Sequence, residues 1–151
     1  MPSASNGPPV RIVADTNTLI SGSLWHGNPA RLLNGVKAGK VTLLQSPPLW
    51  VEFVEVLNRP KFIARLQFLG LTPTMLANGL RQYVIWSADT PIPLPPHLRD
   101  PKDLMVLSAA VAARADAIVT GDDDLLSMES FESIPIMKAR AALEKLGLPT
   151  E

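Results

Sequence analysis

The chain has 151 residues, enough for one domain that buries about two thirds of the surface its unfolded chain exposes. Its 14 basic and 14 acidic side chains give a net charge of zero, so it lacks the broad basic excess that is common in nucleic-acid-binding proteins. It has no cysteine, which excludes disulfides, thiol catalysis and cysteine-bound zinc, and no run of eighteen apolar residues that would cross a membrane.

Both ends of the chain are expected to lie outside the folded domain. Residues 1–9 contain three prolines but neither a basic start nor an apolar core, which predicts a flexible tail and not a signal peptide. Residues 148–151 are expected to form a second, short tail, which leaves residues 10–147 as one domain. The absence of cysteine and of a signal peptide favours a cytoplasmic location.

A buried strand is predicted at residues 10–14, because a short apolar run fits a strand covered on both faces of a parallel sheet. The run breaks at Asp15, which is followed by Thr16 and Asn17, and all three residue types form caps and turns. In open α/β sheets, ligands bind at the carboxyl ends of the strands. Asp15 is therefore either a helix cap or a member of a site, and this stretch alone leaves both open.

Helices and strands alternate along the rest of the chain. Helix starts are indicated where a capping residue precedes a proline, and strands where a short apolar run follows a helix. The predicted helices span residues 28–37, 46–58, 61–68, 72–82, 100–114 and 138–146, with a short helical turn ending near residue 126. The further predicted strands span residues 41–45, 83–86, 117–120 and 134–137, with the end of a helix as the alternative at 83–86 and an extended proline-rich connector at 90–96. This order predicts an α/β protein with a parallel sheet and helices on both faces.

Glu52 lies on the predicted helix 46–58, at the edge of an apolar arc that includes Leu49 and Val56, whereas Glu55 points well away from that arc. Glu52 is either an edge carboxylate that reaches water or an acid carried inward to the end of the first strand. Helix geometry prefers Glu52 over Glu55 for the second role.

Asp100 and Asp103 have a purely structural explanation. Asp100 is the natural cap of the helix 100–114, and Asp103 lies in its first turn, where a carboxylate interacts favourably with the helix dipole. The helix itself is apolar nearly all round, which is typical of a buried helix. Its first turn must therefore lie near the sheet, and a carboxylate there can serve as both cap and site.

Asp122, Asp123 and Asp124 follow the predicted strand 117–120. Three consecutive like charges repel one another unless they are solvated or bind a cation, and a solvated turn explains this stretch by itself. In either an extended strand or a short helix, Asp123 points away from its two neighbours. Taken with the other acids, however, the pattern predicts several carboxylates at one sheet edge. All-oxygen ligands without cysteine favour Mg²⁺ or Mn²⁺ over zinc.

These motifs, in this order, resemble a PIN-domain protein, and in particular the branch described as toxin components of toxin–antitoxin systems. The resemblance spans roughly residues 11–136 and rests on residues 13–17 (VADTN), 46–62, 99–103 (RDPKD) and 118–126 (IVTGDDDLL).

The resemblance implies a three-layer α/β/α sandwich with a central, mostly parallel sheet, and a Mg²⁺- or Mn²⁺-dependent endoribonuclease that hydrolyses RNA phosphodiester bonds. Matched residue by residue, the family's catalytic acids fall on Asp15, Glu52, Asp103, Asp122 and Asp124. Of these, Asp15, Asp103 and Asp122 are expected to bind the metal. Asp100 matches a position of the branch whose role the match does not define.

Contacts to RNA are expected from two places. Thr16, Asn17 and Thr120 lie beside the acids, and Thr120 matches a hydroxyl residue of the family that precedes the final acids. Arg59 and Lys61, together with Arg65, follow the helix that carries Glu52, although a solvated basic turn explains these three equally well.

Partner proteins are also expected. With 46% hydrophobic residues, the chain is expected to form a homodimer, and the resemblance adds an antitoxin protein as a possible partner. The apolar residues expected to mediate association are Phe62, Leu66, Leu69 and Leu71. Two other functions stay open: a non-catalytic PIN-like module that binds RNA or protein, and a phosphatase that uses Asp15 as nucleophile.

Overall fold

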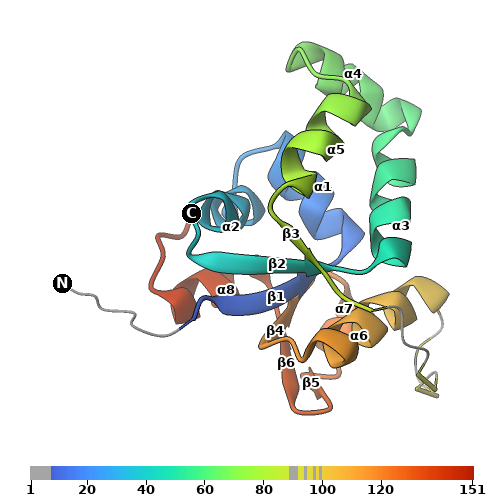
Figure 1. The fold of residues 1–151 in the computed structure, drawn as a ribbon, viewed down its shortest axis with the longest axis vertical. Coiled ribbons are helices and arrows are strands. Elements are labelled where there is room, and N and C mark those ends of the chain that lie inside the picture. Colours follow the sequence, from blue (N-terminus) through green and yellow to red (C-terminus); the bar gives the residue numbers. More distant parts are fainter. Residues whose placement is uncertain (1–7, 89–91, 94, 97, 99) are drawn as a thin grey trace.

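The computed structural model describes residues 8–151 except 89–91, 94, 97 and 99. Its centre is a six-stranded sheet with the strand order β3-β2-β1-β4-β6-β5 (Figure 1). Five strands are parallel: β1 (Val10–Ala14), β2 (Val41–Gln45), β3 (Val84–Trp86), β4 (Ala117–Val119) and β6 (Ile134–Met137). The short edge strand β5 (Ser130–Phe131) pairs with β6 in the antiparallel direction.

Neighbouring residues of the central strand β1 belong to two different hydrophobic cores. Ile12 and Ala14 lie in one cluster of buried side chains, and Val13 lies in the other. The alternation follows from strand geometry, which sends successive side chains to opposite faces of the sheet. Because both faces are covered there, the buried part of the strand, residues 12–14, is a continuous apolar run, whereas Arg11 and the exposed Val10 precede it.

Helices cover both faces of the sheet and complete three layers. The first core receives side chains from α1 (Thr16–Leu24), α2 (Asn28–Lys37), α3 (Pro47–Leu57), α4 (Pro60–Phe68), α5 (Pro73–Arg81) and α8 (Ala139–Leu146). The second core receives them from α6 (Pro101–Ala113) and α7 (Asp123–Leu126). Helices α4 and α5 extend away from the sheet beyond one end of α3 (Figure 1). The predicted three-layer α/β/α sandwich with a mostly parallel sheet is confirmed.

The predicted elements match the observed ones to within a residue at each end, and the structure adds helix α1 and strand β5. Helix α1 directly follows Asp15, where the sequence pattern predicted a cap without a defined helix. The edge strand β5 was not expected, because two residues carry no periodic signal. At Val84–Trp86 the strand replaces the alternative of a helix end. The predicted connector at residues 90–96 falls partly outside the described residues.

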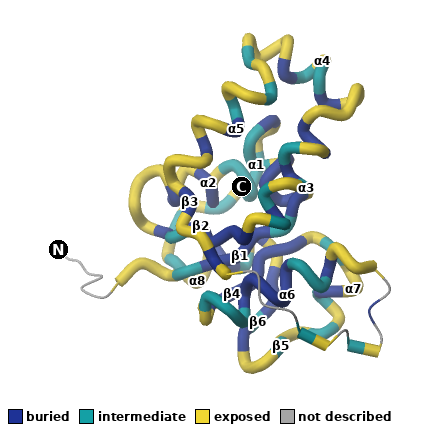
Figure 2. Tube along the Cα trace, turned by 45° about the vertical axis from the view of Figure 1, so that its right-hand side comes forward, coloured by how far each residue is buried: buried dark blue, intermediate teal, exposed yellow. Residues whose placement is uncertain are grey.

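Two of the residues expected to mediate association are buried in the structure. Phe62 and Leu66, expected to mediate association, are 9% and 0% exposed, because they lie four residues apart on the face of α4 that packs into the first core. Of the other two residues expected there, Leu69 is exposed and Leu71 is half-buried; Phe68 and Met75, which were not among those expected, are also exposed. The tube in Figure 2 shows α4 and α5 as alternating buried and exposed segments.

The last residues of the chain contact helix α2. The backbone N–H of Glu151 donates to Asn28 Oδ1 at 2.6 Å, and the Glu151 carboxylate lies 3.3 Å from Arg31 Nε. Residues 1–7 of the expected N-terminal tail lie outside the described residues. In the described ranges, no helix is both long enough and apolar enough to span a membrane.

Candidate metal centre

Asp15 stands at the carboxyl end of β1 and caps helix α1. Its Oδ1 accepts a hydrogen bond from the Thr18 backbone N–H at 2.9 Å, and its Oδ2 accepts one from the Thr120 hydroxyl at 2.5 Å. The second bond crosses from β1 to β4, which are parallel neighbours with Ala14 paired to Val119. Asp15 therefore acts as a cap, and the same carboxylate also faces the end of the next strand.

Thr120 connects the acids at the ends of β1 and β4. While its hydroxyl donates to Asp15, the same oxygen accepts the backbone N–H of Asp122 at 3.0 Å. Asp122 in turn caps the short helix α7, because its Oδ1 accepts the N–H of Asp124 at 2.8 Å. The chain of hydrogen bonds fixes the loop after β4, so that Asp122 and Asp124 take set positions.

Replacing Thr120 by valine is expected to lower the free energy of unfolding by about 1–3 kcal/mol. Valine has nearly the same shape, but it leaves a buried carboxylate oxygen of Asp15 and the Asp122 N–H without their partner, and Thr120 is only 1% exposed. Chemical denaturation of the metal-free protein measures the loss. The Thr120→Ser variant keeps the hydroxyl and should lose much less; equal losses in both variants would show that the methyl group, not the hydroxyl, matters.

Asp103 belongs to a helix that covers the opposite face of the sheet from α1, but it lies at the same end of the strands as Asp15 and Asp122. It lies in the first turn of α6, whose cap Asp100 accepts the N–H of Lys102 at 2.9 Å. Because α6 is packed into the second core, its first turn is held against the sheet edge, and the Asp103 side chain is only 6% exposed.

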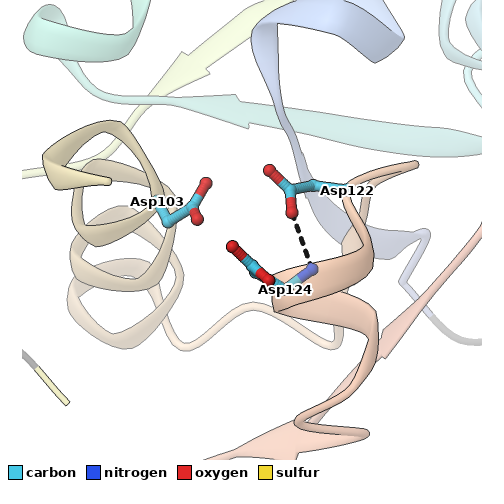
Figure 3. Close-up of side chains that lie close together, drawn as sticks. All are labelled: Asp103, Asp122 and Asp124. Carbon is cyan, nitrogen blue, oxygen red and sulfur yellow. Dashed lines mark hydrogen bonds between the residues drawn. The ribbon is translucent and has the colours of Figure 1, made fainter. Parts of the chain in front are cut away.

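Asp103, Asp122 and Asp124 form a cluster in which one carboxylate oxygen from each lies within 4.8 Å of the others. Figure 3 shows Asp103 on α6 facing Asp122, which precedes α7, and Asp124, which lies in the first turn of α7. The pKa of the Asp103 carboxyl is raised from 3.8 to about 7, chiefly by burial and further by the negative charges of Asp122, Asp100 and Asp124 and by the interaction with the Asp122 side chain. The metal-free cluster therefore holds a proton on Asp103 at mildly acidic pH.

Helix α3 contributes Glu52 to the site. It is half-buried, and it lines a small cavity of about 70 Å³ together with Asp15, Asp103 and Asp122. The structure thus brings these four acids, which are up to 107 residues apart in the sequence, to one cavity. Asp124 joins through its contact with Asp103 and Asp122.

Three residues that line this cavity each have a buried oxygen to which no atom of the described residues donates a hydrogen bond: Thr16 Oγ1, Glu52 Oε2 and Asp103 Oδ2. A buried polar atom without a partner costs free energy, and clustered carboxylates add mutual repulsion. A hard divalent cation with its water ligands relieves both, because it prefers carboxylate, hydroxyl and water oxygens. The donor set of this cavity therefore fits Mg²⁺ or Mn²⁺.

The fold places some of the residues predicted to contact RNA at the acid cavity and others away from it. Thr16 and Asn17 line the acid cavity, and Thr120 forms part of its frame. Arg59 is the N-cap of α4, beyond the end of α3, the helix that carries Glu52, and Lys61 Nζ lies 4.9 Å from the ring centre of Phe62. Neither residue is among those that line the acid cavity.

Arg65, the third predicted basic contact, is held by the protein itself. Its Nε donates to the carbonyl of Leu24 at 2.8 Å, and its guanidinium lies over the rings of Trp25 and Phe68. These contacts tie α4 to the end of α1. Lys102 and Asp100, by contrast, line the acid cavity although no role was assigned to them. Their place between Arg99 and Asp103 in the motif RDPKD was the signal available in the sequence.

Together, the parallel sheet and the acids at the ends of its strands define a three-layer α/β protein with a metal-binding type of pocket. The family model described as PIN domain matches residues 11–124, well over half of the chain, so the protein belongs to the PIN-domain family. PIN domains are generally metal-dependent nucleases, and the acidic cluster is compatible with that chemistry. No curated protein matches the chain.

Proposed function

We propose that this protein is a Mg²⁺- or Mn²⁺-dependent endoribonuclease that hydrolyses RNA phosphodiester bonds. The observation that carries the proposal is the cluster of Asp103, Asp122 and Asp124 beside a small cavity lined with unpaired buried oxygens. The PIN-domain match points to the same class of reaction.

The residues that would hold the cation are Asp103, Asp122 and Asp15, with Asp124 beside them. When bound, a divalent ion supplies acidified water and stabilises negative charge on phosphoryl oxygens. The protein's own part is to hold the acids in place. The Thr18 N–H and the Thr120 hydroxyl fix the carboxylate of Asp15, and the Asp124 N–H fixes that of Asp122.

Glu52 is the residue best suited to orient the attacking water. Its Oε2 accepts no hydrogen bond from the described protein atoms, and it lines the cavity opposite the loop that carries Asp122. A half-buried carboxylate with a free acceptor can hold a water molecule and take up its proton as the water attacks phosphorus. The hydrolysis then breaks the P–O bond to the leaving 3′ oxygen, which is protonated from solvent.

A phosphatase that uses Asp15 as nucleophile has one feature in its favour, because Lys102 lines the acid cavity and could contact a phosphate. Against it, both carboxylate oxygens of Asp15 already accept hydrogen bonds, from Thr18 and Thr120. These hydrogen bonds stabilise the negative charge of the carboxylate and so lower its nucleophilicity. Transfer of label from a phosphomonoester to Asp15 would identify this activity.

The biological setting is part of the proposal. We take the protein to act in the cytoplasm on RNA, as the toxin of a toxin–antitoxin pair, and to form a homodimer. Exposed apolar side chains on and beside α4 and α5, namely Phe68, Leu69 and Met75, support association with a second copy or with an antitoxin.

The activity is tested by incubating labelled single-stranded RNA with the purified protein. Cleavage is expected with Mn²⁺ or Mg²⁺ and should stop when EDTA is added, with products that carry a 5′ phosphate because water attacks phosphorus directly. If the protein binds RNA but leaves it intact with either ion, the non-catalytic module is the correct function.

A further inference from the structure

A second cleft, of about 440 Å³, opens next to the acid cavity on the side of α1, α2 and α8. The two spaces share Asn17, and Thr120, whose hydroxyl is bonded to Asp15, lies in the wall of the cleft. A chain-like ligand whose reacting group lies at the acids can therefore extend past Asn17 into this cleft.

The cleft has a charge opposite to that of the acid cavity. None of the residues that line it is acidic, and two of them, Lys138 and Arg140, are exposed cations. In the part of the chain that the structure describes, neither cation forms a salt bridge. The remaining polar side chains in its walls, such as Asn17, Ser21 and Asn28, are neutral.

The position of Lys138 follows from the same topology that places the acids. Lys138 comes directly after β6, which is the parallel neighbour of β4, so it stands at the same edge of the sheet as Asp122. It is also the cap of α8 and makes no side-chain cap hydrogen bond, and the first turn of α8 contains no acid. The free N–H groups of this turn add to the positive potential of the two cations.

A third cleft, which shares Glu52 and Lys102 with the acid cavity, does not have this positive charge. Lined in part by Glu52, Glu55 and Lys102, it carries two carboxylates and one cation. A polyanion is repelled there and attracted to the α8 side.

From this difference in charge between the two clefts we propose that the cleft of Lys138 and Arg140 binds the phosphodiester backbone of the single-stranded RNA next to the scissile bond. The inference rests on the proposed function, because it takes RNA as the substrate.

The experiment measures binding without cleavage, so that it can succeed or fail separately from the nuclease assay. The full-length protein is titrated in EDTA against a fluorescein-labelled oligouridylate over a series of salt concentrations. Each phosphate contact to a single strand contributes about 0.7 to the slope of log K against log salt concentration. The double variant Lys138→Gln/Arg140→Gln should therefore lower the slope by about 1.4 and weaken binding roughly fivefold or more.

The matched control is Lys37→Gln/Lys40→Gln, which removes the same charge from exposed residues at the end of α2 and before β2, far from the carboxyl ends of the strands. It should bind as the unmodified protein does, and both variants should keep the unmodified thermal unfolding curve. The inference is overturned if the control loses as much binding as the α8 variant, if the slope does not change, or if the unmodified protein does not bind the oligonucleotide.

Discussion

Cleavage of RNA in Mn²⁺ is expected to fall by more than about 100-fold when Asp122 is replaced by asparagine, because the loss of a charged ligand should exceed the 10- to 100-fold cost of losing an outer-shell partner. Asparagine keeps the size of the side chain and an oxygen that can still cap α7, where Asp122 Oδ1 accepts the Asp124 N–H. What it removes is one negative charge from the cluster with Asp103. Initial rates of cleavage at saturating Mn²⁺ give the measurement.

The matched control is Asp123→Asn, one residue along the chain. Asp123 is exposed and lies outside the cluster of Asp103, Asp122 and Asp124. Its replacement removes the same charge from the same loop and should leave the rate within about twofold, since a solvated surface charge interacts only weakly with its surroundings. Equal losses for the two variants would mean that the loop acts through its overall charge and not through ligands.

Raising the pH from about 4 to about 7 is expected to destabilise the metal-free protein through Asp103. The pKa of this carboxyl is raised from 3.8 to about 7 in the folded state, first by burial and then by the neighbouring acids. Below pH 3.8 the group is protonated in both states and costs nothing; above it, the unfolded chain ionises first and is favoured. By pH 7 a shift of about three units corresponds to about 4 kcal/mol of lost stability.

Urea unfolding in EDTA at several pH values tests this expectation. The Asp103→Asn variant carries no titrating group at this position, so the difference in stability between it and the unmodified protein should grow with pH and level off above the folded pKa. Excess Mn²⁺ should reverse the loss in the unmodified protein, by about 2.7 kcal/mol at one hundred times the dissociation constant. A difference that stays constant with pH would show that Asp103 has the same pKa in the folded and the unfolded protein.

The layers of the fold could be predicted from the sequence because each one depends on local signals. Residues 12–14 and 117–119 are apolar without alternation, which is typical of strands buried on both faces. Proline after a capping residue marks the starts of α3 and α6, where Ser46 and Asp100 form the cap hydrogen bonds. These signals act within a few residues, so a single sequence contains them.

The same local signals identified the candidate acids, but they did not show which of those acids share one site. Asp15, Asp100 and Asp122 are all cap residues in the structure, as their sequences indicate, and a cap by itself says nothing about chemistry. Only the parallel pairing of β1 with β4 and the packing of α6 bring Asp15, Asp103 and Asp122 to one cavity. The raised pKa of Asp103 depends on that packing as well.

The basic residues show most clearly that nearness in the sequence differs from nearness in the fold. Arg59 and Lys61 are close to Glu52 in the sequence, but α3 carries them away from the cavity by its length, since a helix rises about 1.5 Å per residue. Lys138 is distant in the sequence from Asp15, Glu52 and Asp103, yet it follows a strand of the same parallel sheet and lines the adjoining cleft. The sequence determined the strands, the helices and the acids at their ends, because those depend on neighbouring residues. Which charges share a cavity was decided by the strand order, because it sets residues more than a hundred positions apart side by side.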